Sequence, residues 1–176
     1  MLAGIALVAV AGTAACGVGR PRPGDERVTA DAREPVTDAA APYLLLRLGE
    51  RRLYLMDDDP RTPVESFAIA VGRDGLETPT GRFQVEELVV DPEFVVIDRE
   101  DRTRVARRIP PGPDNPLGAR WIGFAHGDGW TVGIHGTPRP ELLGRAVSRG
   151  CVRMRNADVI RLYDRVRPGT AVVVEP

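Results

Sequence analysis

The sequence predicts a strand-dominated domain, a β-sandwich or a partly open barrel, with one or two short helices near its C-terminal end. Three observations favour this fold class. Apolar residues fall in short, often alternating runs, turn residues separate these runs, and helical spacing occurs in only two late stretches. The chain has 176 residues, which suggests one domain, and no internal repeat is visible.

The first strands form an expected hairpin, because YLLLRL (43–48) and RLYLM (52–56) flank a turn at Gly49–Arg51. Further strands are expected where β-branched and aromatic residues cluster. They cover residues 66–72, 81–90, 94–98, 120–124, 130–136 and 170–175. Turn residues separate them at 57–60, 73–75, 110–113 and 127–129.

Two stretches have the spacing of short helices. Residues 139–147 have Pro140 in the first turn and apolar residues at 142, 143, 146 and 147. Residues 156–166 start with Asn156 as a cap and stop before Pro168-Gly169. We therefore expect one helix between residues 135 and 151 and a second after it.

The N-terminal segment indicates export. Residues 1–16 carry no charged side chain, and small residues precede Cys16, as in a secretory signal that ends in a lipobox-like cysteine. Residues 17–41 contain hardly a large apolar residue and predict a flexible tether. We expect the folded domain at 42–176, outside the cytoplasm and lipid-anchored to the membrane through Cys16. An unlipidated signal peptide or a plain anchor is the alternative.

Composition excludes some partners. The formal net charge is −1, so nothing indicates nucleic-acid binding. We expect a monomer that needs no metal and no cofactor.

The stretch IHGTPRPELLGRAVSRGCVRM (134–154) carries one of the two histidines and one of the two cysteines. His135 would end a strand, the helix would turn the chain, and Cys151 would begin the next element close by. A thiol is mostly protonated at neutral pH, and a neighbouring imidazole that takes its proton makes the reactive thiolate. Gly150 allows unusual dihedrals, and the N–H groups of Gly150 and Cys151 could bind an acyl oxygen. The hydroxyl of Ser148 could pin the turn.

Three other interpretations of the same residues compete. A lone cysteine is often a small buried apolar residue. Cys16 and Cys151 could form a disulfide, although Cys16 at a processing site is a poor structural partner. Zinc would need more ligands than Cys151, His135 and His126 supply, and His126 is by default a loop histidine.

These motifs resemble a known family. HGT at 135–137 and SRGCVRM at 148–154 are similar to the signature of the L,D-transpeptidase catalytic domain (YkuD-type). ETPTGRFQV (77–85), NPLGARWIGF (115–124) and NADVIRLYDRVRPGTAVVV (156–174) also resemble the family, so the match extends over about residues 43–175. Arg149 stands where histidine is common, so a role for that histidine does not carry over.

The resemblance implies a β-sandwich and a peptidoglycan substrate. Cys151 would attack a tetrapeptide stem and release D-Ala, and an amine of a second stem would resolve the thioester as a 3→3 cross-link. His135 would be the base. Other residues would support the site: Gly150, Ser148, Arg153, Gly136, Thr137 and Trp121. Arg153 would hold a substrate carboxylate or brace the loop, and Thr137 and Trp121 would form walls of the cleft.

The acceptor stays open. Water would make the protein an L,D-carboxypeptidase or endopeptidase, and a lysine of another protein would make it a protein-to-wall anchoring enzyme. A non-catalytic wall-binding module would be expected to lack the cysteine or the histidine, and both are present. A redox or metal-binding lipoprotein would need a further cysteine or a cluster of carboxylates.

Overall fold

The computed structural model describes residues 13–14, 42–57, 59, 61–98, 101, 103–127 and 130–176. Within these ranges the chain forms fourteen strands, one 3₁₀ turn and one α-helix. The strands are β1 (Thr13–Ala14), β2 (Tyr43–Arg47), β3 (Arg52–Met56), β4 (Glu65–Ala68), β5 (Val71–Gly72), β6 (Gly81–Gln84), β7 (Glu87–Val90), β8 (Glu93–Ile97), β9 (Val105–Ile109), β10 (Arg120–Gly127), β11 (Trp130–His135), β12 (Ala146–Ser148), β13 (Val152–Arg153) and β14 (Ala171–Glu175). The 3₁₀ turn η1 spans Pro140–Leu142, and helix α1 spans Asn156–Tyr163. The expected strand-dominated fold is confirmed.

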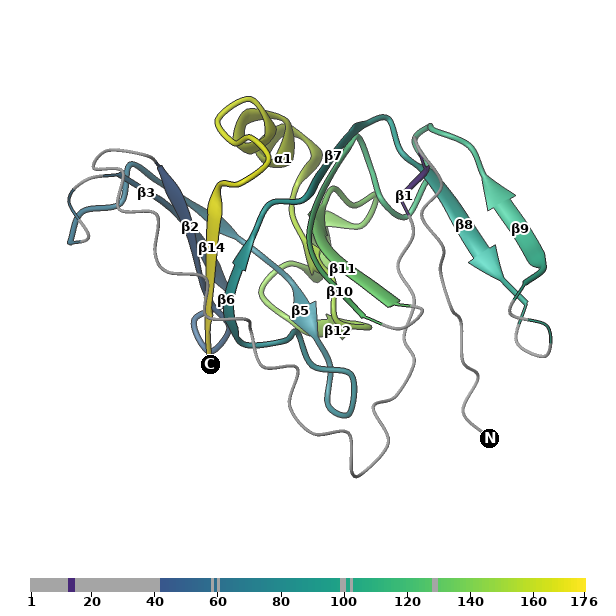
Figure 1. Ribbon diagram of the computed structural model, residues 1–176, viewed down its shortest axis with the longest axis horizontal. Coiled ribbons are helices and arrows are strands. Elements are labelled where there is room, and N and C mark those ends of the chain that lie inside the picture. The colour runs from purple at the N-terminus through teal and green to yellow at the C-terminus, as the bar shows by residue number, and fades with distance from the viewer. Residues whose placement is uncertain are drawn as a thin grey trace.

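Two larger sheets form the body of the sandwich. One has the strand order β4-β3-β2-β14-β6, and the other has the order β13-β11-β10-β7. Two smaller sheets pair β12 with β5 and join β1, β8 and β9. Figure 1 shows strands β2, β3, β14 and β6 at the left, β10 and β11 near the centre, helix α1 at the top, and the β8–β9 hairpin projecting at the right.

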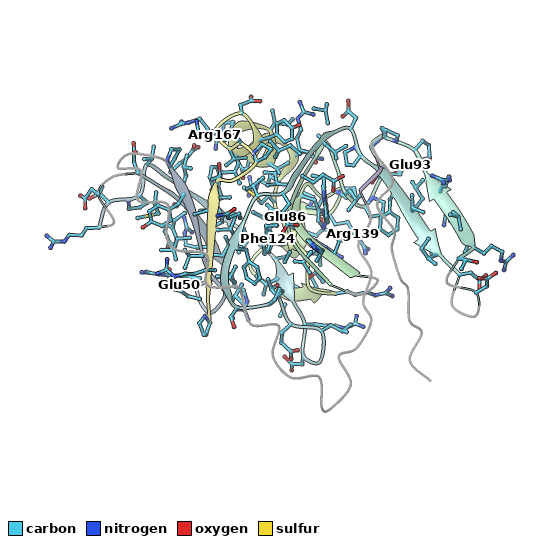
Figure 2. The ribbon with its side chains drawn as sticks, viewed as in Figure 1. Glu50, Glu86, Glu93, Phe124, Arg139 and Arg167 are labelled. Atoms are coloured by element: carbon cyan, nitrogen blue, oxygen red, sulfur yellow. The ribbon has the colours of Figure 1, made fainter. Side chains whose placement is uncertain are left out.

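The main core lies between these two sheets because alternate residues of each strand point inward. The buried inward residues include Leu44, Leu46, Leu53, Leu55, Phe67, Ile122, Phe124, Val132, Ile134, Val152, Val172 and Val174. Phe124, labelled in Figure 2, packs edge-on against Phe83, with their ring centroids 5.5 Å apart. Helix α1 adds Val159 and Leu162 to the same core and contacts β10 and β11.

The expected strand at 81–90 is two strands in different sheets. β6 pairs with β14, whereas β7 pairs with β10. At the crossing, the N–H of Val85 donates to Thr170 O at 2.8 Å and the N–H of Glu86 donates to Gly123 O at 2.8 Å. The two adjacent residues thus donate one backbone hydrogen bond to each sheet, and the chain passes from one sheet to the other between them. The run 66–72 is likewise divided, into β4 and β5.

The expected helix at 139–147 is wrong. Only Pro140–Leu142 form a 3₁₀ turn, and Leu143 is already extended (φ −64°, ψ 148°). The following residues form β12, which pairs in parallel with β5 through Ala146–Val71 and Ser148–Gly72. Sheet pairing satisfies the backbone groups here, and this tertiary contact overrides a weak helical pattern.

Helix α1 forms as expected but is shorter and capped differently. It ends at Tyr163, and Arg155 rather than Asn156 occupies the N-cap position. The Asn156 side chain instead accepts from the Ala119 N–H at 3.0 Å and donates to Thr137 O at 3.4 Å. It therefore ties the start of the helix to two loops. No helix in the described part of the chain is long and apolar enough to cross a membrane.

Candidate active site

The parallel pairing of β11 with β13 brings the two ends of the stretch 134–154 together. Ile134 pairs with Val152, and His135 pairs with Arg153. Ile134 and Val152 point into the core, so by alternation His135 and Cys151 share the opposite face of the sheet. Strand spacing and rise per residue place their Cα atoms about 8 Å apart as diagonal neighbours. The sheet register, and not the expected helix, thus makes them neighbours.

Cys151 is covered by side chains on this second face. It is 3% exposed and belongs to a small buried cluster with Leu117 and Trp121. Its Sγ lies 3.9 Å from the carbonyl oxygen of Thr131. The thiol therefore sits in a largely apolar recess at the β11 edge.

Cys151 is disulfide-bonded in this structure. The other cysteine of the sequence, Cys16, lies outside the described residues. Nucleophilic chemistry at Cys151 requires its reduced form, because only the thiolate is nucleophilic.

Hydrogen bonds from two hydroxyl groups fix the loop that carries Cys151. Ser148 Oγ donates to the carbonyl of Cys151 and accepts from the Gly150 N–H at 3.1 Å. Thr78 Oγ1 donates to Gly150 O at 2.8 Å and accepts from the Gly72 N–H at 3.0 Å. Gly150 has φ +112°, which other residues rarely adopt. These bonds hold the residue before Cys151 in one conformation.

The hydrogen bond between Gly150 and Ser148 changes the expectation for the site that would bind an acyl oxygen. The Gly150 N–H, expected to bind such an oxygen, is engaged by Ser148. In this conformation Gly150 serves the shape of the loop instead.

Thr78 was not predicted as a site residue, although it lies in the ETPTG segment that resembles the family. Thr78 is 2% exposed, so its hydroxyl is a buried group with two partners. It joins the turn at 77–80 to the loop before Cys151.

His135 is a buried and neutral imidazole. It is 3% exposed, and its Nδ1–H donates to the carbonyl of Gly136 at 2.6 Å. The pKa of His135 is lowered to about 4, chiefly by burial and also by the nearby charge of Arg153, while the carbonyls of Gly136 and Leu117 partly oppose the shift. With the proton on Nδ1, Nε2 is the ring nitrogen that can accept one. The side chain has the form that a general base requires.

Trp121 does not line a cleft, contrary to expectation. It is fully buried (0% exposed), and its indole stacks on the ring of His135 with centroids 5.9 Å apart and planes 22° apart. The loop residue Leu117 and the partly buried Val89 and Phe94 pack against the same cluster. Because both faces of the sheet are covered, Trp121 is inaccessible to solvent although it lies next to the site.

Thr137 is also buried, but it borders a surface pocket. The pocket has a volume of about 550 Å³ and is lined by Thr137, Pro138, Pro140, Glu141, Arg155 and Asn156. The Thr137 hydroxyl accepts from the Arg139 N–H at 3.1 Å. The pocket is therefore bordered by a residue that follows His135 by two positions in the sequence.

Arg153 lies beside His135 in the sheet, and it forms no ion pair with an acidic side chain of the described residues. Burial lowers the pKa of Arg153, and the charges of Arg139 and Arg149 lower it further. Its Nε is buried and has no hydrogen-bond partner among the described residues. The guanidinium therefore has donor capacity that the described protein groups do not fill.

His126 is separate from this arrangement. It is exposed near the end of β10, and its Nδ1 lies 2.7 Å from Glu86 Oε2. In the described parts of the chain, no group of three or more His, Cys, Asp or Glu side chains converges as a metal site.

Comparison with known proteins assigns this arrangement to a family. A model of the L,D-transpeptidase catalytic domain (YkuD) matches residues 41–174. The chain belongs to the L,D-transpeptidase catalytic domain family. The Bacillus subtilis protein YqjB is 37% identical over 135 residues, which cover 76% of this chain and 70% of that protein. The Escherichia coli protein ErfK/SrfK is 33% identical over 144 residues, which cover 78% of this chain and 45% of that protein. Both carry L,D-transpeptidase in their names.

Solved structures share the fold. L,D-transpeptidase 3 of Mycobacterium tuberculosis superposes with a TM-score of 0.59 at 17% identity, covering 78% of this chain and 62% of that one. The catalytic domain of the Enterococcus faecium L,D-transpeptidase gives 0.56 at 22% identity, covering 76% of this chain and 96% of that one. This chain thus spans about three fifths of the M. tuberculosis structure and nearly all of the E. faecium catalytic domain.

Thr78→Val should destabilise the protein and also disturb the Cys151 loop. The substitution keeps the shape but leaves the Gly150 carbonyl and the Gly72 N–H without a partner, at a cost of about 1–3 kcal/mol. Urea unfolding measures this cost, and alkylation of the reduced protein should slow about 10-fold because the thiol is misplaced. Thr170→Val is the matched control, since Thr170 is also buried and accepts from the Arg167 N–H far from the site. Equal alkylation rates for the two variants would contradict a role for Thr78 in the loop.

The depressed pKa of His135 predicts a pH-dependent stability. Because the unfolded chain binds this proton near pH 6.5 and the folded chain only near pH 4, stability is full above about 6.5 and is lost as pH falls towards 4. Between pH 7 and pH 4, the wild type should lose roughly 3 kcal/mol more than His135→Gln. Urea titrations at the two pH values measure the difference. His126→Gln should behave like the wild type, and a wild-type loss no larger than that of His135→Gln would refute the linkage.

Proposed function

We propose that this protein is a peptidoglycan L,D-transpeptidase in which Cys151 is the nucleophile and His135 is its base. The observation that carries this proposal is the β11–β13 register, which sets the two residues diagonally on one buried face. A neutral imidazole beside the thiol meets the requirement for an activated nucleophile. The Gly136 carbonyl orients the ring, so the third member of the group is a backbone atom.

The first half-reaction forms a thioester. His135 Nε2 takes the proton of the reduced Cys151 thiol, and sulfur attacks the carbonyl that joins the third residue of a tetrapeptide stem to D-Ala. The carbon–nitrogen bond breaks, and the imidazolium returns the proton to the amine of D-Ala, which leaves.

The second half-reaction transfers the acyl group. An amine of a neighbouring stem attacks the thioester, its proton passes to His135, and Cys151 leaves as the thiolate. The product is an amide that joins the third residues of two stems, a 3→3 cross-link.

We assign stabilisation of the acyl oxygen to the backbone N–H of Cys151. Ser148 engages the Gly150 N–H, so Gly150 supports the turn through its backbone conformation. A donor on the nucleophile itself keeps a fixed position relative to the reacting carbonyl.

We assign Arg153 to a carboxylate of the substrate. Its buried Nε is unfilled by the described residues, and Arg139 and Arg149 add positive charge nearby. A guanidinium binds a carboxylate strongly through paired, charge-assisted hydrogen bonds. We assign Thr137, which borders the adjacent pocket, to contact with the substrate there.

The alternative functions use the same acyl-enzyme and differ in the acceptor. Water would give an L,D-carboxypeptidase or endopeptidase, and a protein lysine would give an anchoring enzyme. Product analysis separates them, because only transfer to a stem amine yields cross-linked dimers.

The place of action follows from the substrate and the N-terminal sequence. Members of this family act on the cell wall, which lies outside the cytoplasm. We propose that residues 1–16 direct export, that a lipid on Cys16 anchors the protein, and that residues 17–41 form the spacer. Cys16 and the spacer lie outside the described residues, so sequence alone supports this anchoring.

Cys151→Ala should abolish cross-linking without unfolding the domain, because the nucleophile is lost from a small buried position. Purified reduced protein is incubated with tetrapeptide stems, and dimers are quantified by mass spectrometry. The Cys16→Ser protein is the matched control for loss of a thiol and should retain activity. Undiminished dimers with Cys151→Ala would refute the nucleophile, and free tripeptide without dimers from the wild type would favour the carboxypeptidase.

Cys16→Ser should move the protein from the membrane pellet to a soluble extracytoplasmic fraction in cells. Stable anchoring takes more than one lipid chain, and each buried CH₂ contributes about 0.8 kcal/mol. Cell fractionation and immunoblotting measure the distribution. Retention of the variant in the pellet would indicate an uncleaved anchor instead of a lipid.

A further inference from the structure

The indole of Trp121 occupies a space that two glycines provide. Gly123 on β10 pairs with Gly133 on β11, and both lie on the Trp121 face, two residues along from Trp121 and from His135. A Cβ at Gly123 would lie 2.9 Å from Trp121 Nε1, and one at Gly133 would lie 2.7 Å from Trp121 Cζ2. The indole therefore lies flat over both strands, where any larger residue at either glycine would displace it.

Glu87 fixes the far end of this ring. Glu87 on β7 pairs with Gly123, and its Oε2 accepts the indole N–H of Trp121 at 3.1 Å. Burial raises the pKa of Glu87, and the indole donor partly offsets this by favouring the carboxylate. A partly buried carboxylate at this place has a specific partner in the indole.

The other parts of the indole reach the two residues that carry the proposed chemistry. The imidazole of His135 stacks on Trp121, and Cys151 belongs to the same buried cluster. The Nδ1–H bond to Gly136 and the interaction with the Leu117 carbonyl hold the edge of the His135 ring. The stacked indole contacts the face of the ring and restricts the tilt of its plane.

We propose that Trp121, held by Glu87, is a positioning residue that sets the orientation of the His135 ring towards Cys151. It acts through His135 and does not contact the substrate, because it is fully buried. The proposal rests on the assigned roles of Cys151 and His135. Its test uses a chemical reaction of Cys151 that needs no peptidoglycan, so the two can fail separately.

The first measurement is the rate of iodoacetamide alkylation of Cys151 in the reduced protein as a function of pH. Trp121→Leu should slow alkylation at neutral pH on the order of 10-fold to 10²-fold, because a misplaced base loses its alignment. Its pH profile should move towards that of an ordinary thiol, which titrates near ~8.5. The charge of Arg153 also lowers the pKa of His135. Because Arg153 is unchanged in every variant, it does not account for differences between their pH profiles.

The Glu87 variants separate a specific hydrogen bond from bulk. Glu87→Gln keeps an oxygen that accepts the indole N–H and should stay within about 3-fold of the wild type. Glu87→Leu removes the acceptor and Trp121→Phe removes the donor. Each of these single variants should slow alkylation about 10-fold. If Trp121→Leu fails to fold, these two variants carry the same test.

The matched control is Phe124→Leu. Phe124 lies on the same strand and is 1% exposed, but it packs in the main core between the sheets. It should lower the melting temperature and leave the pH profile of alkylation unchanged. If Phe124→Leu shifts the profile as much as Trp121→Leu, Trp121 has only a structural role and the proposal is overturned.

A spectroscopic measurement reports the stacking directly. The chain has two histidines, and only His135 is buried against an indole, so its ring protons should carry an upfield ring-current shift. In Trp121→Leu this shift should vanish, and in Glu87→Gln it should persist. An unchanged His135 resonance in Trp121→Leu would overturn the proposal whatever the protein's activity. In transpeptidation, the variants that lose the hydrogen bond should lower kcat and leave KM nearly unchanged, and a change confined to KM would also overturn it.

Discussion

The parallel pairing of β11 with β13 is the constraint on which the core and the site both depend. It is short, and flanking backbone bonds support it. Met154 N–H donates to His135 O at 2.8 Å, and Arg153 exchanges two backbone bonds with Ala70 at 2.8 and 3.0 Å. Because side chains alternate along a strand, a slip of one residue would move Ile134 and Val152 out of the core and turn His135 away from Cys151. The register therefore specifies the core packing on one face and sets His135 and Cys151 together on the other.

Burial of the second face determines the electrostatics of the site. Leu117 and Trp121 keep water from His135, which holds its imidazole neutral, and the charge of Arg153 acts in the same direction. A base that is neutral before the reaction can take a proton as soon as a thiol is present.

The sequence predicted the fold class, and it also indicated the two residues of the proposed site, because both leave local signals. Alternation and turn residues mark the strands, and the HGT and SRGCVRM motifs mark His135 and Cys151. It did not predict the sheet change at Val85–Glu86 or the replacement of the helix at 139–147 by β12, because both depend on distant partners. Arg-rich β9 was missed because its residues are mostly exposed and do not alternate in polarity. The burial of Trp121 was invisible because alternation does not reveal that a loop covers the second face.

The central claim is that Cys151 and His135 act as one unit. Mass spectrometry of the reduced protein with a carbapenem tests it most directly, because attack of a cysteine thiolate opens the strained lactam ring and leaves a covalent adduct. The account predicts a single adduct on Cys151 that forms about 10²-fold more slowly in His135→Ala, in line with the contribution of a general base. An adduct that persists in Cys151→Ala, or equal rates in the wild type and His135→Ala, would contradict it.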